Sequence, residues 1–558
     1  MRRWILPTTD SSRDDLRTLN PVLAKVLHRR GAHDYFSAQR LLSGVERGGD
    51  PFAMLGMAQA VKRIKTAIRR GEQIAAFGDF DVDGVTATVL LTQTLRALGA
   101  KVQPFIPDRF SEGYGLHVKA LRRLRRQGVS LVVTVDCGIR SVREVKAARR
   151  HDLDVIVTDH HEPGPILPEA LAIINPKQPG CTSNEPFLAG VGVAYRLAQA
   201  LLEDMPVPWL AAEDLLDLVA LGTVADLVPL NAPANRCLAR AGLDRMRRSP
   251  RPGIRALLRE ASIQPELICA ESIAYQLAPR LNSAGRMAHA ALAYELLATN
   301  DEMEAYTLAA QLNDLNTARR AATAEALTHA ETLLDVSAPA LVAADPSFEP
   351  GILGLVASQL ADSHARPAFV IKQGAGRSRG SGRSHSPAFN VVEALHSCRD
   401  LLAEFGGHAG AAGFALNTHN IPALRQRLCE LASRLVAEET PALHIDAVVE
   451  AGDLNLENAE ALAALDPVGM GNPAPVLCVQ GLKLLDAATM GKDKSHLRLH
   501  LVTDEGELLE AVGFGLARRR AELPERVDLA VHLTRQFWKG RLQAQIQVVE
   551  FKESEGNP

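Results

Sequence analysis

The fold is decided by the stretch Gln73-Ile-Ala-Ala-Phe-Gly-Asp-Phe-Asp-Val-Asp-Gly-Val85, in which a short apolar run leads directly into three aspartates. The run over 74–77 has the length of a buried strand, and the residues after it predict a helix over 85–98. Outward from this stretch, strands are expected at 102–106, 130–135 and 153–157, with helices around 117–126 and 142–150 between them. Strands and helices that alternate at this spacing predict a parallel, doubly wound α/β sheet, which binds ligands beyond the carboxyl ends of its strands.

The three aspartates after the first strand, Asp79, Asp81 and Asp83, predict a metal site. Alternate residues of an extended segment point to the same side, and three like charges so close together repel one another unless a cation compensates them. The alternative is that these aspartates only cap the helix that follows. An EF-hand calcium loop is excluded, because its twelfth position would hold Leu90 instead of an acid.

Ionisable side chains follow the next two strands in the same way. The run over 132–135 leads into Asp136, and the run over 155–157 leads into Thr158-Asp-His-His161. Two adjacent imidazoles at the end of a strand are able to face one or two metal ions, with Asp159 available to orient them. A further apolar run leads into Asp226.

Six of these side chains form one candidate set of ligands beside the sheet: Asp81, Asp83, Asp136, His160, His161 and Asp226. Oxygen and nitrogen donors without a thiolate suit Mn²⁺ or Mg²⁺ better than a structural zinc ion. Six ligands are enough for two ions about 3.5–4 Å apart. A pair of divalent ions beside an α/β sheet indicates hydrolytic phosphoryl chemistry.

The length of 558 residues suggests three or four domains at about 150 residues each. Leucines three or four residues apart, such as Leu308 and Leu312, predict one long helix between two of them. Short β-like runs near the end of the chain, at 497–502, 527–534 and 542–549, predict a small β-barrel. The expected order is an N-terminal helical segment, a catalytic α/β core, a connector helix, a second α/β domain and the barrel, over 1–70, 71–300, 301–335, 336–440 and 441–558.

The charge of the chain is balanced as a whole but uneven along its length. Lys and Arg number 62 against 65 Asp and Glu, a net charge of −3 that indicates no polyanionic partner. Residues 236–260 hold eight Arg and two acids, however, and residues 366–383 hold five basic residues and no acid. We expect these two runs to flank phosphate-binding segments. The six acids of 440–466 are expected to form a solvated face.

Several classes of protein are excluded by the sequence. The seven Cys include no Cys-x-x-Cys pair, which argues against zinc ribbons and a disulfide framework. The first apolar stretch stops at Pro7 without the hydrophobic region of a signal peptide, and no run of about 18 apolar residues predicts a membrane span. A cytoplasmic protein without a membrane partner is expected.

Four motifs, in the order in which they occur, resemble those of the DHH phosphoesterase superfamily. They are Asp-x-Asp-x-Asp-Gly, Asp-Cys-Gly, Asp-His-His and Gly-Thr-Val-Ala-Asp, at 79–84, 136–138, 159–161 and 222–226. The resemblance extends to stretches typical of the members that degrade single-stranded DNA, at 109–116, 280–286, 380–384, 406–413, 466–473 and 537–540. It implies a DHH parallel-sheet core, a connector helix, a DHHA1-type accessory domain and a C-terminal OB-fold.

The resemblance also implies an activity, namely metal-dependent 5′→3′ exonuclease hydrolysis of the phosphodiester bonds of single-stranded DNA, in DNA recombination and repair. The implied metal ligands are the six residues above, with two Mn²⁺ or Mg²⁺ ions and with Asp79 in the outer shell. The implied DNA-binding residues are Arg109, Tyr114, Arg280, Ser381, Gly382, Arg383, Gly407 and His408. Several of these lie in Gly-rich stretches, expected here as loops, where the backbone can approach a phosphate closely.

Implied partners are single-stranded DNA with a free 5′ end and a single-strand-binding protein or helicase, with the chain acting as a monomer. One departure from the family pattern is Glu349, which puts a carboxylate near the expected phosphate path. Two alternatives stay open. A DHH phosphodiesterase for short oligonucleotides or cyclic dinucleotides would lack the region 441–558, and a non-catalytic single-strand-binding replication scaffold would have lost metal ligands.

Overall fold

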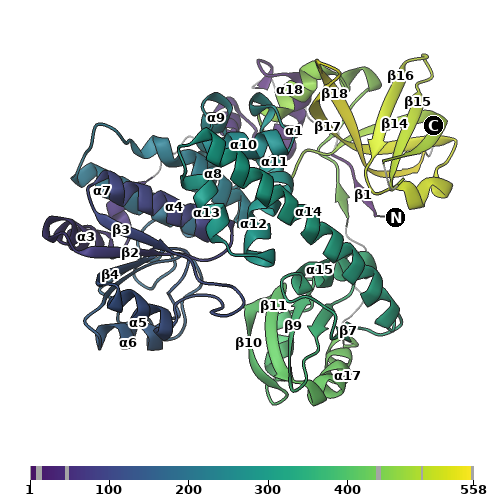
Figure 1. Cartoon of the computed structure of the whole chain (residues 1–558). Coiled ribbons are helices and arrows are strands. Elements are labelled where there is room, and N and C mark those ends of the chain that lie inside the picture. Colours follow the sequence, from purple (N-terminus) through teal and green to yellow (C-terminus); the bar gives the residue numbers. More distant parts are fainter. Residues whose placement is uncertain (1, 8–15, 44–48, 435–441, 492–493, 555–558) are drawn as a thin grey trace.

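The computed structural model describes residues 2–7, 16–43, 49–434, 442–491 and 494–554. Figure 1 shows three lobes: a large helix-rich core, a smaller accessory domain joined to it by the long helix α14 (Glu302–Leu333), and a C-terminal barrel. The expected boundary at 440/441 falls within 435–441, which lies outside the described residues, as do parts of the expected segment 1–70. Across the described ranges, no helix combines the length and the apolar character that crossing a bilayer requires.

The core is built on a five-stranded sheet in the order β3-β2-β4-β5-β6, and every neighbouring pair is parallel. Its elements are β2 (Gln73–Phe77), α4 (Val82–Ala97), β3 (Lys101–Phe105), α5 (Val118–Arg126), β4 (Val129–Thr134), α6 (Val142–Arg149), β5 (Asp154–Thr158) and β6 (Ala172–Ile174). The alternation predicted from the sequence is therefore confirmed, and β6 is an additional, short edge strand.

Helices cover both faces of the core sheet. On β2, Ala75 and Phe77 pack with apolar residues of α5 and α6, whereas Ile74 and Ala76 pack with α4 and other helices on the opposite face. The remaining core helices are α3 (Met57–Arg70), α7 (Gly190–Asp204), α8 (Leu216–Ala225), α9 (Pro233–Arg248), α10 (Pro252–Glu260), α11 (Ala270–Ser272), α12 (Ala278–Met287) and α13 (Ala291–Ala298).

The accessory domain has a five-stranded sheet in the order β10-β11-β9-β8-β7, in which only β7 and β8 are parallel. Its elements are β7 (Leu341–Asp345), α15 (Leu353–His364), β8 (Ala368–Lys372), β9 (Arg377–Arg383), α16 (Val391–Ser397), β10 (Leu402–His408), β11 (Ala411–Asn417) and α17 (Ile421–Ala432).

The Gly-rich stretches of this domain are strands, so the prediction of loops was wrong. Gly380 and Gly382 lie on β9, and a Cβ there would come within 2.3 Å of the Phe414 ring and 2.6 Å of the Phe369 ring, respectively. Gly407 lies on β10. The glycines of β9 make room for aromatic side chains packed against the sheet, and local sequence does not reveal such partners.

The C-terminal barrel closes on itself, because the order β13-β14-β15-β16-β18-β17 is completed by pairing of β14 with β17. Its elements are β12 (Leu443–His444), β13 (Ala447–Val448), α18 (Leu456–Ala463), β14 (Leu477–Met490), β15 (His496–Val502), β16 (Leu508–Gly513), β17 (Arg526–Trp538) and β18 (Arg541–Glu553). The predicted small barrel is confirmed.

The first elements of the chain pack against this barrel rather than on the core. They are β1 (Trp4–Ile5), which pairs in parallel with β12, and the helices α1 (Pro21–Arg29) and α2 (Tyr35–Ser43). Val22, Leu23 and Val26 of α1 are buried in one cluster with barrel residues. Figure 1 shows this return of the N-terminus to the C-terminal lobe.

Arginines of α9 join the core to the barrel and to α2. Arg236 is 4% exposed and donates hydrogen bonds to the carbonyls of Leu41 (2.6 Å) and Leu465 (3.0 Å). Arg240 donates to the carbonyls of Leu42 and Ala464. The expectation that the basic run 236–260 flanks a phosphate path is wrong for these side chains, because partners within the protein already bind them.

Candidate metal centre

The three aspartates after β2 lie at the start of α4. Asp81 is the N-cap residue, and its Oδ1 accepts a hydrogen bond of 3.0 Å from Gly84 N. Asp83 lies in the first helical turn, where the positive end of the helix dipole favours an anion. Helix capping and clustering of carboxylates, which the sequence left as alternatives, therefore occur together.

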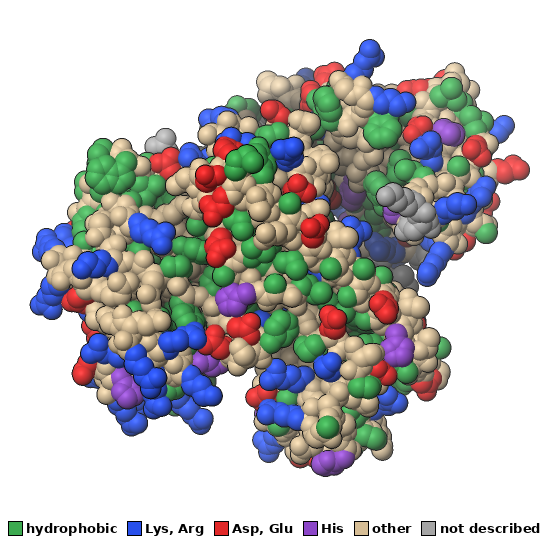
Figure 2. All heavy atoms as spheres, viewed as in Figure 1, with side chains coloured by type: hydrophobic (Ala, Val, Ile, Leu, Met, Phe, Trp, Pro, Cys, Tyr) green, Lys and Arg blue, Asp and Glu red, His purple; other side chains and the backbone are tan. Residues whose placement is uncertain are grey.

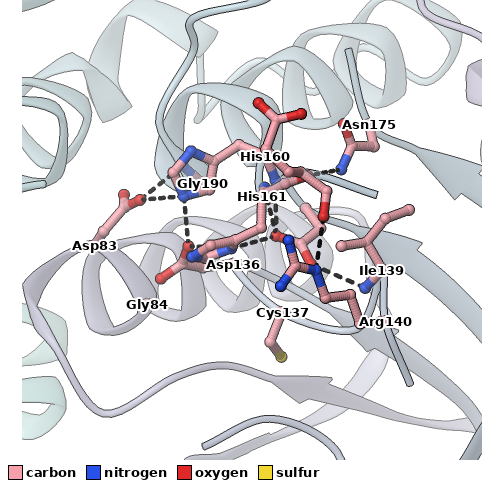
Figure 3. Close-up of polar contacts among 12 residues, drawn as sticks. Asp83, Gly84, Asp136, Cys137, Ile139, Arg140, His160, His161, Asn175 and Gly190 are labelled. Atoms are coloured by element: carbon pink, nitrogen blue, oxygen red, sulfur yellow. Dashed lines mark hydrogen bonds and ion pairs between the residues drawn. The ribbon is translucent and has the colours of Figure 1, made fainter. Parts of the chain in front are cut away.

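Asp136 and the two histidines complete the group from the ends of β4 and β5. His160 Nε2 lies 3.1 Å from Asp136 Oδ1, 3.8 Å from Asp83 Oδ2 and 3.6 Å from Asp226 Oδ2. Asp226 is contributed by the C-terminal end of α8. Figure 3 shows the His160 imidazole between Asp83 and Asp136. The fold thus gathers six side chains that span 146 positions of the sequence (81 to 226) into adjoining groups.

Three overlapping sets of side chains in this group have the spacing to hold a metal ion. They are Asp136–His160–His161, Asp83–His160–Asp226 and Asp79–Asp81–Asp136. Asp79 Oδ1, Asp136 Oδ1 and His160 Nε2 are buried and have no hydrogen-bond partner among the described residues. Buried polar atoms are normally satisfied, so these unpaired acceptors fit divalent cations. The donor set contains only oxygen and imidazole nitrogen, as Mn²⁺ and Mg²⁺ prefer.

The electrostatics of the group show the same need for cations. Burial, followed by the charge of Asp81, raises the pKa of Asp83 to about 7. Burial and neighbouring carboxylates also raise the pKa values of Asp136 and Asp226. Burial, followed by the charge of His161, lowers the pKa of His160 to about 3, which keeps its imidazole neutral and able to donate a lone pair.

Asp159 holds His161 in position. Its Oδ1 lies 2.8 Å from His161 Nδ1 and accepts hydrogen bonds from the backbone N–H groups of His160 and His161. Burial alone would lower the pKa of His161. The hydrogen bond to Asp159 and the negative charge of Asp159 outweigh this effect and raise the pKa. With the proton on Nδ1, the Nε2 atom of His161 is left as an acceptor, the arrangement typical of a carboxylate-oriented metal ligand.

Two glycines make room for these carboxylates. Gly222 opens the motif at 222–226, whereas sequence analysis did not single out Gly190. A Cβ on Gly190 would come within 2.6 Å of Asp136 Oδ1, and a Cβ on Gly222 within 2.9 Å of Asp83 Oδ1. The backbone N–H groups of Gly190 and Val191 donate to Asp83 at 2.6 and 2.8 Å. The start of α7 therefore both binds Asp83 and leaves the space that Asp136 occupies. Asp136 itself has a φ of 61°, in the left-handed region.

A cluster of arginines lies beside the acidic group. The Arg109 guanidinium lies 4.8 Å from the centre of the Phe80 ring, and the charges of Asp79 and Asp81 act on it. Burial, followed by the charges of Arg109, Arg319 and Arg383, lowers the pKa of Arg286 to about 9. Cations held this close together attract an anion. Arg286 and Arg319 were not singled out from the sequence, although Arg286 ends the motif stretch 280–286.

Two predicted DNA-binding residues meet His161 directly. Tyr114 OH lies 3.2 Å from His161 Nδ1, and its side chain is 51% exposed. The His408 ring, at the end of β10, stacks on the His161 ring at 6.0 Å with an interplanar angle of 11°. The accessory domain thus reaches the metal centre at this point.

Other residues predicted to bind DNA lie on β9 and on the core helix α12. Arg383 donates to Ser381 Oγ at 2.7 Å, and both extend along β9 with Gly382. Arg280 is held by Asn313 Oδ1 (3.1 Å) and by the Gln276 carbonyl (2.8 Å) instead of joining the arginine cluster. Glu349 is exposed in the turn between β7 and α15.

A parallel sheet with clustered aspartates and an Asp-His-His motif at its edge, joined by a long helix to a second domain, defines a DHH-type phosphoesterase. Family models agree: residues 73–223 match the DHH family, N-terminal domain, residues 337–434 match the DHHA1 domain, and residues 445–550 match the RecJ OB domain. The chain belongs to the RecJ family.

Relatives match over most of the chain. A Bacillus subtilis protein named single-stranded-DNA-specific exonuclease RecJ is 39% identical, over 99% of this chain and 71% of its own length. The crystal structure of RecJ from Thermus thermophilus in complex with Mn²⁺ is 31% identical and superposes with a TM-score of 0.83, over 99% of this chain and 80% of that one. Its complex with Mg²⁺ is 30% identical, with a TM-score of 0.77, over 99% of this chain and 79% of that one.

Proposed function

We propose that this chain is a divalent-metal-dependent exonuclease that hydrolyses the phosphodiester bonds of single-stranded DNA from the 5′ end. The proposal rests on three buried atoms, one each on Asp79, Asp136 and His160, that have no hydrogen-bond partner among the described residues. An arginine cluster lies next to them. The acceptors suit cations and the arginines suit the phosphate that those cations activate. The RecJ relatives, which are named for this activity, support the substrate class.

Each part of the site has a separate task in this reaction. Asp81, Asp83, Asp136, His160, His161 and Asp226 would hold a pair of Mn²⁺ or Mg²⁺ ions, with Asp79 behind them. The bound ions supply a water of lowered pKa and neutralise charge on the phosphate oxygens. Asp159 keeps the proton of His161 on Nδ1. Arg109, Arg286 and Arg383 would bind phosphate oxygens, and the exposed ring of Tyr114 would stack on a base near the 5′ end.

The experiment is digestion of 5′- and 3′-labelled single- and double-stranded DNA with Mn²⁺, Mg²⁺ or EDTA. We expect mononucleotides from the 5′ end of single strands only, and no product in EDTA. Asp136→Ala and His160→Ala should be inactive, whereas Glu203→Gln, at an exposed acid of α7, should cut normally. Release from 3′ ends or from blunt duplex would overturn the proposal, and preference for short oligonucleotides or cyclic dinucleotides would favour the phosphodiesterase alternative.

We further propose that the chain acts as a monomer in the cytoplasm, on single strands exposed by a helicase or presented by a single-strand-binding protein. All six candidate ligands come from one chain, so the site needs no second copy. An enzyme limited to single strands depends on a partner that supplies them. Light scattering of the purified protein, with and without oligonucleotide, tests the monomer, and a shift to dimer mass at the concentrations used for activity would contradict it.

A further inference from the structure

The outer faces of α5 and α6 form a dense basic surface that the catalytic site does not use. We define the α5–α6 face by its ten basic residues: Lys119, Arg122, Arg123, Arg125, Arg126, Arg140, Arg143, Lys146, Arg149 and Arg150. All ten are exposed. The inward sides of the same helices, with Leu121, Leu124 and Val145, are buried against the sheet. The charge is therefore segregated onto one side of each helix.

Few acids neutralise this face. Within 117–151 the only acids are Asp136, which is buried in the metal centre, and Glu144. Ion pairs join Arg123 to Glu112 and Arg149 to Glu169. Arg122, Arg126, Arg143 and Lys146 make no side-chain hydrogen bond or ion pair with any residue that the structure describes.

The α5–α6 face is continuous with the mouth of the catalytic site. Arg140 stands just before α6, where its Nε donates to the Glu162 carbonyl at 2.8 Å, and its charge acts on His408. Figure 2 shows basic side chains over α5 and α6 and, across the gap, on the facing edge of the accessory domain. A nucleic acid that reaches the site between these domains passes this surface.

We infer that the α5–α6 face binds the phosphate backbone of duplex DNA that adjoins the single-stranded end in the catalytic site. Residues 117–151 include no Phe, Tyr or Trp, so the face has no platform on which unpaired bases would stack. An array of cations without aromatic rings instead suits a ligand whose bases are hidden and whose phosphates are closely spaced. The inference extends the proposed function, because it places the paired part of a partly single-stranded substrate outside the site.

The test measures binding in EDTA, so its result does not depend on nuclease activity. The probes are a blunt, fluorescently labelled DNA hairpin and a labelled oligo(dT) strand, with anisotropy recorded over a series of salt concentrations. The variant carries Arg122→Gln, Arg126→Gln, Arg143→Gln and Lys146→Gln. Each phosphate contact contributes about 0.9 to the slope of log K against log salt, so loss of four contacts should lower the slope by about 3.6. We expect hairpin affinity to fall about 10- to 100-fold. Binding of oligo(dT) should be unchanged.

A matched variant removes the same charge from exposed positions on or beside the helices of the opposite face: Lys62→Gln, Arg69→Gln, Arg96→Gln and Lys101→Gln. It should bind both probes as the unmodified protein does. Thermal melting of both variants controls for folding, and unchanged cleavage of a short single strand controls for the catalytic site. Equal hairpin binding by all three proteins would overturn the inference. Equal loss of hairpin affinity in both variants would indicate a general charge effect. An equal loss of oligo(dT) affinity in the α5–α6 variant would identify a single-strand site. Either result would overturn the inference.

Discussion

Two regions of this molecule hold charged side chains that differ in whether they have hydrogen-bond partners within the protein. At the junction of α9 with α2 and the barrel, Arg236 is bound by two backbone carbonyls, and Asp466 accepts hydrogen bonds from Arg247 and from the Ala270 backbone. At the metal centre, Asp79 and Asp136 retain buried oxygens with no hydrogen-bond partner among the described residues.

This difference separates structural charges from functional ones. A buried charge costs free energy unless it is paired, so a folded protein satisfies the charges that only hold it together. The charges at the metal centre have no such partner in the described part of the chain, because a bound metal ion neutralises them. Without the ion, they lower the stability of the fold. The comparison predicts opposite outcomes when single charges are removed from the two regions.

The largest effect is expected at Asp136. Asp136→Asn should lower the exonuclease rate about 1,000-fold or more, because metal binding supplies several kcal/mol of transition-state stabilisation. The free energy of unfolding in EDTA should not fall, since the substitution relieves repulsion from Asp83 and Asp81. Rates on labelled single strands and melting curves in EDTA provide the two measurements. A stable variant that keeps a tenth of the activity would remove Asp136 from the ligand set.

Arg236 should behave in the opposite way. Arg236→Met removes the donor to the Leu41 carbonyl and one of two donors to the Leu465 carbonyl, which Asn472 also binds. We therefore expect the free energy of unfolding to fall by about 2 kcal/mol. The rate per folded molecule should stay within about twofold. Urea unfolding measures the first quantity and single-turnover cleavage the second. Arg248→Met, at an exposed position of the same helix, is the matched control and should leave both unchanged.

Substitution of Gly190 is expected to disturb the metal centre by displacing a ligand. Its replacement by Ala would place a Cβ 2.6 Å from Asp136 Oδ1, so the carboxylate must move by a distance that ligand geometry does not tolerate. We expect a rate loss of about 100-fold with weaker Mn²⁺ binding, on the basis that a misplacement of about 1 Å is this costly. Gly376→Ala is the control, because no atom lies within 4 Å of the added carbon. Normal Mn²⁺ affinity in Gly190→Ala would show that the site adapts.

The smallest effect is a dependence of stability on pH. The pKa of Asp83 is raised to about 7 in the folded protein, so the folded state binds a proton more tightly than the unfolded state does. Stability present at low pH is therefore lost as the pH rises through about 7. In EDTA we expect the melting temperature to fall by about 2–4 °C between pH 6 and 8. Saturating Mn²⁺ should abolish this fall, and Asp83→Asn should reduce it, because the pKa values of Asp136 and Asp226 are also raised. A fall of the same size in saturating Mn²⁺ would show that groups outside the metal centre cause it.

Sequence analysis located the parallel sheet and the acidic group because both are local signals. Each strand of the core that carries a ligand ends in an ionisable residue, and an apolar run followed by Asp136 or by Asp159-His160-His161 is visible without any contact information. The order of parallel strands then brings these ends to one edge. The roles of the individual site residues remain predictions for the experiments above.

The features that sequence analysis missed depend on partners far along the chain. A side chain at position 190 would clash with Asp136, 54 positions away, and one at position 380 would clash with the Phe414 ring, 34 positions away. The sequence predicts that the basic run 236–260 flanks phosphate-binding segments, but Arg236 is bound by the carbonyls of Leu41 and Leu465. Composition reports how much charge a segment holds, and only the fold shows whether another part of the chain already neutralises it.

The pairing of β1 with β12 has a consequence for how this protein is made. Trp4 and Ile5 are synthesised more than four hundred residues before their partners Leu443 and His444. At about 5–20 residues per second, this delay lasts roughly 20–90 s. Val22, Leu23 and Val26 of α1, which end up buried with the barrel, have no surface to pack on during that time. This apolar segment of the nascent chain therefore stays exposed to chaperones until the barrel has been synthesised.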